Sequence, residues 1–257
     1  MQVGVVAVNT FREAVRDRVL YNLIFFALLM IAAAVLVGQI SIGIERLVIL
    51  NLGLSAISIF GLVMAVFIGV GLVYKEIDKR TLYTLLSKPV HRWEFLAGKY
   101  AGLLLTLLVN TALMTLGLAA ALLYVSHRFV RGDAYLLVAV YFILLELALV
   151  TALALFFSCF SSPMLSTVFT LSIYVAGIFA PGLRDIAALT GSRALGALTT
   201  PLYYLLPNFH NFNVIAAAAH GQAVPFSLVL HNTLYAALYI AAVLLPAAAI
   251  FSNRNLN

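Results

Sequence analysis

The segment from Tyr74 to Lys99 carries the densest set of charged side chains in the chain. It holds nine of the 24 charged residues in the sequence. They are Lys75, Glu76, Asp78, Lys79, Arg80, Lys88, Arg92, Glu94 and Lys99. The same segment also keeps apolar side chains that a purely solvated loop would not need, namely Leu82, Tyr83, Leu85, Leu86, Trp93 and Phe95. Apolar groups rimmed by charge are typical of a docking surface, so we predict that this segment binds a partner protein. The simpler alternative is a solvated basic loop at a membrane face.

Glu146 is the second residue whose type and position could do chemistry. It lies near the middle of an apolar run, Ala134–Phe157, where insertion scales assign a charged side chain a cost of roughly 2.5–3.5 kcal/mol. We therefore expect it to face the interior of a helix bundle or water. Two roles stay open: a pore-lining or proton-transferring group, and a neutral acid that hydrogen-bonds a neighbouring helix. Asn110 and Thr111 are candidate partners at comparable depth.

A transport path would need further polar side chains within the apolar runs. Asn51 and Ser55 share one face of the second run, and Asn110 lies in the third. Together with Glu146 they form the predicted lining of such a path.

The sequence lacks the common signatures of catalysis and of nucleotide or metal binding. It contains no G-x-x-x-x-G-K-S/T, no H-E-x-x-H and no G-x-S-x-G, and its five histidines have no i, i+4 spacing. We therefore predict no catalytic, cofactor-binding or metal-ligating residue, and a protein that is not itself an enzyme. A single cysteine, Cys159, excludes an internal disulfide.

Composition indicates an all-α polytopic membrane protein with a single transmembrane domain over residues 1–257. Hydrophobic residues make up 64% of the chain and charged residues 9%, with a mean hydropathy of +1.10. Soluble domains are roughly 45–50% apolar and 25% charged. The net charge of +6 does not indicate a nucleic-acid partner, because Lys and Arg accumulate in the cytoplasmic loops of membrane proteins.

Six apolar runs are long enough to cross a bilayer as helices. They are Val19–Ile40, Leu47–Val73, Tyr100–Val125, Ala134–Phe157, Met164–Ala180 and Ser227–Phe251. In the second run, Gly61 and Gly69 permit close helix contact. Residues 2–18 form an amphipathic pattern with Val8, Phe11 and Val15 on one stripe, which predicts a helix in the membrane surface. The alternative is a plain extension of the first span.

The stretch between the fifth and sixth runs is interrupted by proline. Pro181, Pro201, Pro207 and Pro225 break it, and the apolar pieces 195–207 and 212–219 are too short to span. We predict re-entrant or interfacial helices there, which require cover by protein or water.

The distribution of Lys and Arg predicts the orientation. With the N-terminus inside, cytoplasmic segments hold ten basic residues and outer segments five. Both termini and the segment 74–99 are thus expected in the cytoplasm.

The pattern E-x-x-x-x-TL-x-x-LLSKPV-x-R-x-EFLAGK, which begins at Glu76, resembles the signature loop of ABC-2-type ABC transporter permeases. The layout of the whole chain is similar to that family, and most similar to permeases grouped with multicopper-enzyme maturation exporters. Arg80 stands where the family usually has glycine before its Thr-Leu pair.

The resemblance implies a coupling helix from Glu76 to Ser87 and a second ATPase contact at Ser158–Pro163. The implied docking residues are Glu76, Asp78, Lys79, Arg80, Thr81, Leu82, Leu85, Leu86, Ser158, Ser161 and Ser162. It also implies a homodimeric permease in the inner membrane of a prokaryote, driven in the direction of export by two ATPase subunits that bind ATP and Mg. Two rival interpretations remain: a proton-coupled secondary transporter that uses Glu146, weakened by the lack of inverted repeats, and an intramembrane enzyme, weakened by the missing motifs.

Overall fold

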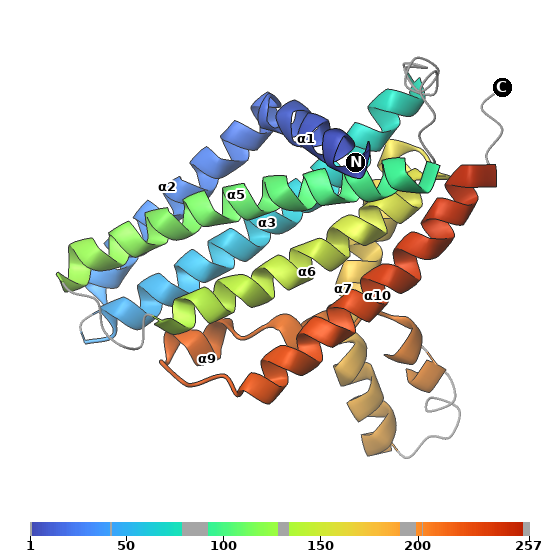
Figure 1. Ribbon diagram of the computed structural model, residues 1–257. Coiled ribbons are helices and arrows are strands. Elements are labelled where there is room, and N and C mark those ends of the chain that lie inside the picture. The colour runs from blue at the N-terminus through green and yellow to red at the C-terminus, as the bar shows by residue number, and fades with distance from the viewer. Residues whose placement is uncertain are drawn as a thin grey trace.

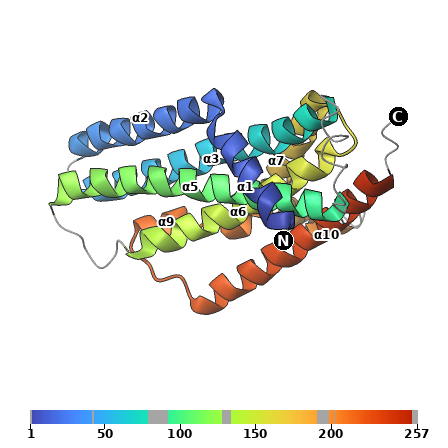
Figure 2. The same cartoon turned by 45° about the horizontal axis from the view of Figure 1, so that its top comes forward.

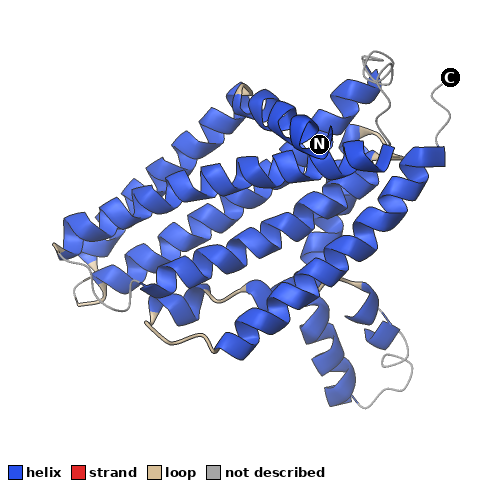
Figure 3. Cartoon of the chain, in the orientation of Figure 1, coloured by secondary structure: helices blue, strands red, loops and turns tan. Residues whose placement is uncertain are grey.

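The computed structural model describes residues 2–41, 43–78, 92–127, 134–190, 199–201 and 203–253. Every regular element in these residues is a helix (Figure 3). The elements are α1 (Gln2–Val15), α2 (Arg18–Ile40), α3 (Glu45–Asp78), α5 (Arg92–Ser126), α6 (Ala134–Ser158), α7 (Pro163–Thr190), η2 (Phe209–Phe212), α9 (Ile215–Ala219) and α10 (Phe226–Asn253).

Six of the helices in the described residues are long and apolar enough to span a membrane, which confirms the prediction of six spans. They lie within α2, α3, α5, α6, α7 and α10, and their boundaries fall close to the predicted runs. Local signals explain several ends. The Asp17 side chain accepts a hydrogen bond from the Val19 amide and caps α2. Pro163 opens α7 at the first helical position, where its missing N–H costs nothing.

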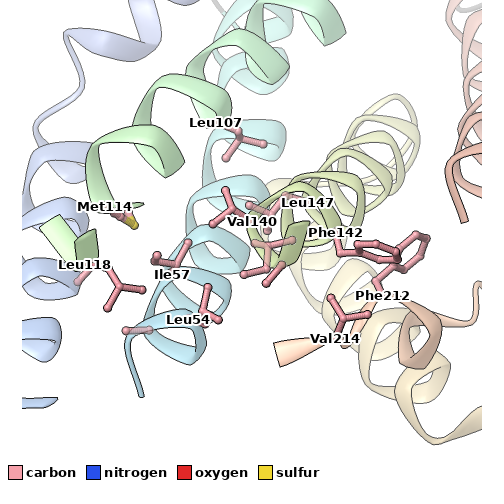
Figure 4. Packing of buried hydrophobic residues seen from close by; sticks show 14 of the residues in the cluster. Leu54, Ile57, Leu107, Met114, Leu118, Val140, Phe142, Leu147, Phe212 and Val214 are labelled. Carbon is pink, nitrogen blue, oxygen red and sulfur yellow. The ribbon is translucent and has the colours of Figure 1, made fainter. Parts of the chain in front are cut away.

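The bundle is built around α6. Within the spans, 72% of α6 is buried, against 17% of α10 and 22% each of α2 and α7. Side chains from α3, α5, α6 and the 209–214 segment meet in one buried core (Figure 4). The second span supplies Gly61 and Gly69, where an added Cβ would lie 2.7 Å from Leu147 and 2.8 Å from Ala154 of α6. The predicted close contact at these two glycines is therefore confirmed. The exposed apolar surfaces of α2, α7 and α10 suit a lipid environment.

The two ends of the bundle carry different elements (Figure 1). One end gathers α1, the last turns of α3, the start of α5 and the end of α10. The opposite end gathers the starts of α3, α6 and α10 together with α9.

The predicted break at Pro181 is wrong, because α7 continues through this proline to Thr190. A proline inside a helix removes one backbone hydrogen bond and crowds the preceding turn, but neighbouring elements can satisfy the freed groups in membrane proteins. The prediction that the pieces after this helix are too short to span is confirmed for the described residues. In the described residues between α7 and α10, only short helical pieces occur, including η2 and α9, and none can span a membrane.

Candidate functional site

The predicted main docking segment is only partly described. α3 runs unbroken from the membrane span to Asp78, so Glu76 and Asp78 belong to the end of the spanning helix. The other predicted docking residues of this segment, Lys79, Arg80, Thr81, Leu82, Leu85 and Leu86, lie outside the described residues.

The turn between α6 and α7, Ser158–Pro163, lies at the same end of the bundle as the end of α3 (Figure 1). Ser158 is 3% exposed and its hydroxyl donates to the Leu155 carbonyl at 2.8 Å, so its side chain faces the protein. The Ser161 hydroxyl donates to the Phe157 carbonyl at 3.1 Å, and Ser162 is exposed. Phe160, 46% exposed, enlarges the apolar surface of this turn. Among the predicted docking residues Ser158, Ser161 and Ser162, Ser158 is therefore the least accessible to an ATPase subunit.

The first turns of α5 form the last part of the segment 74–99, and α1 crosses them (Figure 2). Gly98 and Gly102 form the contact. A Cβ at Gly98 would lie 2.6 Å from the Val6 Cβ, and one at Gly102 would lie 2.5 Å from the Ala7 carbonyl oxygen. Small residues four apart allow this approach of two backbones. The spacing was visible in the sequence as a G-x-x-x-G, although its partner helix was not.

An ion pair reinforces this contact between α1 and α5. Lys99 is 2% exposed, and its Nζ lies 3.7 Å from Glu13 Oε2 and 5.8 Å from the centre of the Phe95 ring. α1 therefore has one face that packs on protein, while Val8 on its other face is exposed and available to lipid. That α1 lies in the membrane surface stays a prediction.

Glu146 lies in the middle of α6 and is 8% exposed. The Tyr174 hydroxyl of α7 donates to Glu146 Oε1 at 2.7 Å. The expectation that Asn110 or Thr111 supplies this partner is wrong, because Glu146 faces α7 whereas Asn110 faces α3. The amide of Asn110 donates to the Met64 sulfur at 3.6 Å and is 3% exposed.

A cavity of about 90 Å³ adjoins Glu146. Its walls come from α3, α6, α7 and residues 209–215, and they include Ser58, Tyr174 and Asn213. Asn51 and Ser55, predicted to line a path with Glu146, are half-buried and lie outside this cavity. Asn51 donates to the Leu47 carbonyl of its own helix at 3.1 Å. The structure therefore does not bring the four predicted path residues together.

Residues 205–213 are held between α7 and α10. A Cβ at Gly177 would lie 2.2 Å from the Pro207 carbonyl oxygen and 2.7 Å from the Phe209 ring, so α7 touches this segment through a bare backbone. From α10, the Tyr235 hydroxyl accepts from the Asn208 amide at 2.8 Å, and Asn232 donates to the Asn211 carbonyl at 3.0 Å.

Through these contacts the segment reaches the cavity beside the mid-helix residue Glu146. That its helical pieces are re-entrant or interfacial stays a prediction. The Asn-rich run N-F-H-N-F-N, residues 208–213, was the sequence signal for this arrangement. Sequence reasoning missed Tyr174, Ser58 and Asn213.

Within the described part of the chain, no three His, Cys, Asp or Glu side chains are grouped so that they could hold a metal ion. The single cysteine, Cys159, is buried. The arrangement at Glu146 is thus a polar cavity inside an apolar bundle, without a metal-ligand set.

Residues 5–256 match a protein-family model described as ABC-2 family transporter protein. No curated protein matches the chain.

Proposed function

Since this chain belongs to the ABC-2 family of transporter proteins and is the membrane subunit of an ABC transporter, we propose that a separate ATPase subunit docks on the segment from Tyr74 to Lys99 and drives it. The observation that carries the proposal is the family match over nearly the whole chain. The absence of a P-loop motif from these 257 residues supports a nucleotide site on another subunit.

The continuity of α3 provides the mechanical link. ATP binding closes the ATPase pair and displaces the docked segment. Because α3 continues as one helix from Glu45 to Asp78, a displacement at its last turns moves the span itself. α3 packs closely on α6 where Gly61 meets the Leu147 side chain and Gly69 meets the Ala154 side chain, so the motion passes to the central helix. The result is a shift between inward-facing and outward-facing populations.

The finer assignments follow the resemblance of the loop motif. The permease is a homodimer with two ATPase subunits, it works as an exporter, and it lies in the inner membrane of a prokaryote with both termini in the cytoplasm. α1 and the end of α10 lie at the same end of the bundle as the last turns of α3 and the start of α5, which flank the undescribed part of the docking segment, and this supports that topology (Figure 1). The ATPase subunits bind the ATP and Mg.

The experiment is a double substitution in the docking segment. Glu76→Ala with Arg80→Ala removes one acidic and one basic side chain, and we expect co-purification of the ATPase subunit to fall at least about tenfold while membrane insertion stays normal. The matched control is Arg131→Ala with Asp133→Ala, which removes the same two kinds of charge from the loop between α5 and α6. Equal recovery of the ATPase subunit with both double variants would contradict the docking role.

The same purification separates the rival functions. A permease that moves cargo alone under a proton gradient, with no ATPase subunit, would support a secondary transporter that uses Glu146. The family match argues against this function and against an intramembrane enzyme.

A further inference from the structure

The cavity beside residues 209–215 combines a single carboxyl group with aromatic walls. Glu146 lines it together with Tyr174, Phe209 and Phe212. No Lys or Arg is among its described lining residues, and the one basic residue among them, His210, is exposed. An ionised carboxylate in apolar surroundings is strongly disfavoured unless a positive charge or a proton accompanies it. The site therefore favours a cationic occupant.

The polar groups of the cavity offer several hydrogen-bond acceptors. The Tyr174 hydroxyl donates to Glu146 Oε1 at 2.7 Å, which orients the carboxyl group and leaves Oε2 as an acceptor. Ser58 and Asn213 belong to the same lining. The Asn213 side-chain oxygen also accepts a hydrogen bond from the Ile215 backbone N–H at 3.4 Å. A primary ammonium group has three N–H donors and no acceptor, so it matches this set.

The aromatic walls suit the same ligand. Phe209 and Tyr174 lie with ring centres 4.9 Å apart and planes tilted by 54°. The faces of such rings attract ammonium groups at contact distance. A volume of about 90 Å³ exceeds what a proton alone needs. A lone carboxylate with aromatic neighbours is also a poor ligand set for a divalent metal, which takes six or more oxygen ligands in the case of calcium.

We propose that this cavity binds a primary ammonium group, with Glu146 as its counter-ion, and that the cargo of the transporter carries such a group. The second part rests on the proposed transport function, whereas binding of the amine does not.

The test measures binding of n-butylammonium to the purified full-length protein by its thermal stabilisation in detergent. We expect a saturable rise in melting temperature with n-butylammonium. Three controls at the same concentrations should raise the melting temperature little. 1-Butanol lacks the charge, sodium lacks the apolar tail, and tetramethylammonium lacks the N–H donors. Equal stabilisation by 1-butanol would show an apolar cavity only, and equal stabilisation by sodium or tetramethylammonium would show unspecific cation binding. Each of these results would overturn the proposal on the wild-type protein alone.

Substitutions in the cavity test whether n-butylammonium binds there. Glu146→Gln should weaken the apparent affinity for n-butylammonium by at least about tenfold. Tyr174→Phe keeps the ring and should weaken it about two- to tenfold. The matched control, Glu45→Gln, makes the same chemical change at the first residue of α3, outside this cavity, and should bind like wild type. Undiminished affinity in a folded Glu146→Gln protein would refute the assignment. If the wild-type protein binds no n-butylammonium but still associates with the ATPase subunit, this inference is overturned and the proposed function stands. If it binds n-butylammonium but no ATPase subunit, the inference on binding stands and the proposed function is overturned.

Discussion

Gly177 is the point at which the bare backbone of α7 touches residues 207–209, and Gly177→Ala is the most direct perturbation of that contact. The added methyl group would lie 2.2 Å from the Pro207 carbonyl oxygen, whereas ordinary contacts begin at 3.4 Å. The segment or α7 must therefore move by about 1 Å or more to restore van der Waals distance. The obstacle is a backbone oxygen, which cannot turn away as a flexible side chain could.

Two opposing contributions set how much Gly177→Ala destabilises this contact. Overpacking of a tight contact costs about 1–3 kcal/mol. Replacement of glycine by alanine inside a helix stabilises the helix by about 1 kcal/mol. The balance is a local destabilisation of about 1 kcal/mol for the contact between α7 and residues 207–213, which corresponds to a factor of about five in a local opening equilibrium.

Hydrogen exchange measured by mass spectrometry gives the assay. The Asn208 backbone N–H donates to the Tyr235 hydroxyl. The protection of this N–H against exchange therefore reports whether residues 207–213 stay packed against α10. We expect peptides that cover residues 207–213 to exchange about fivefold faster in Gly177→Ala than in wild type. The matched control is Gly182→Ala on the same helix, where an added Cβ meets nothing within 4 Å. In that variant the peptides that cover residues 207–213 should exchange at the wild-type rate or slightly more slowly.

Equal exchange in Gly177→Ala and Gly182→Ala would refute the reasoning, because it would mean that the contact at Gly177 does not hold the segment. Faster exchange spread over α2 and α5 as well would indicate general unfolding, and would equally argue against a local contact.

Three further outcomes are expected. Gly102→Val should lower the melting temperature through a loss of about 1–3 kcal/mol as α1 is forced from α5, whereas Gly4→Val, with open space around it, should not; equal melting temperatures would contradict the close contact. A membrane-impermeant maleimide should label Asn9→Cys only from the cytoplasmic side and Ile44→Cys only from the opposite side. The native Cys159 is buried and should not react with it. Labelling of both introduced cysteines from one side would refute the topology. Light scattering of the purified permease should give the mass of a homodimer, and a monomer mass for the active complex would contradict the proposed assembly.

The six spans could be predicted from the sequence because length and apolarity are properties of each segment by itself. A run such as Ala134–Phe157 must be helical in a bilayer, since no other isolated conformation satisfies its backbone there. The absence of spans from the described residues between α7 and α10 followed in the same way from short runs and prolines. Pro181 shows the limit of that reasoning, because a helix can continue through proline when its surroundings satisfy the freed backbone group.

The candidate site was less accessible to such reasoning. The mid-membrane position of Glu146 indicated an important carboxyl group, but depth alone could not distinguish Asn110 from Tyr174 as its partner. Ser158 fell within the predicted docking turn, and only its hydrogen bond to Leu155 shows that it points inward.

The sequence by itself determined the class of the protein, the number of its spans and the polar residues available to a site, because the cost of placing each side chain in a membrane depends on that residue and its near neighbours. The tertiary structure decided which helix faces meet: α1 on α5, Glu146 against α7, and residues 205–213 between α7 and α10. The physical reason is that helix packing is a property of pairs of surfaces. Where a glycine lets two backbones touch, the complementary surface can lie about thirty residues away in the chain, as Phe209 does from Gly177, and no local pattern specifies it.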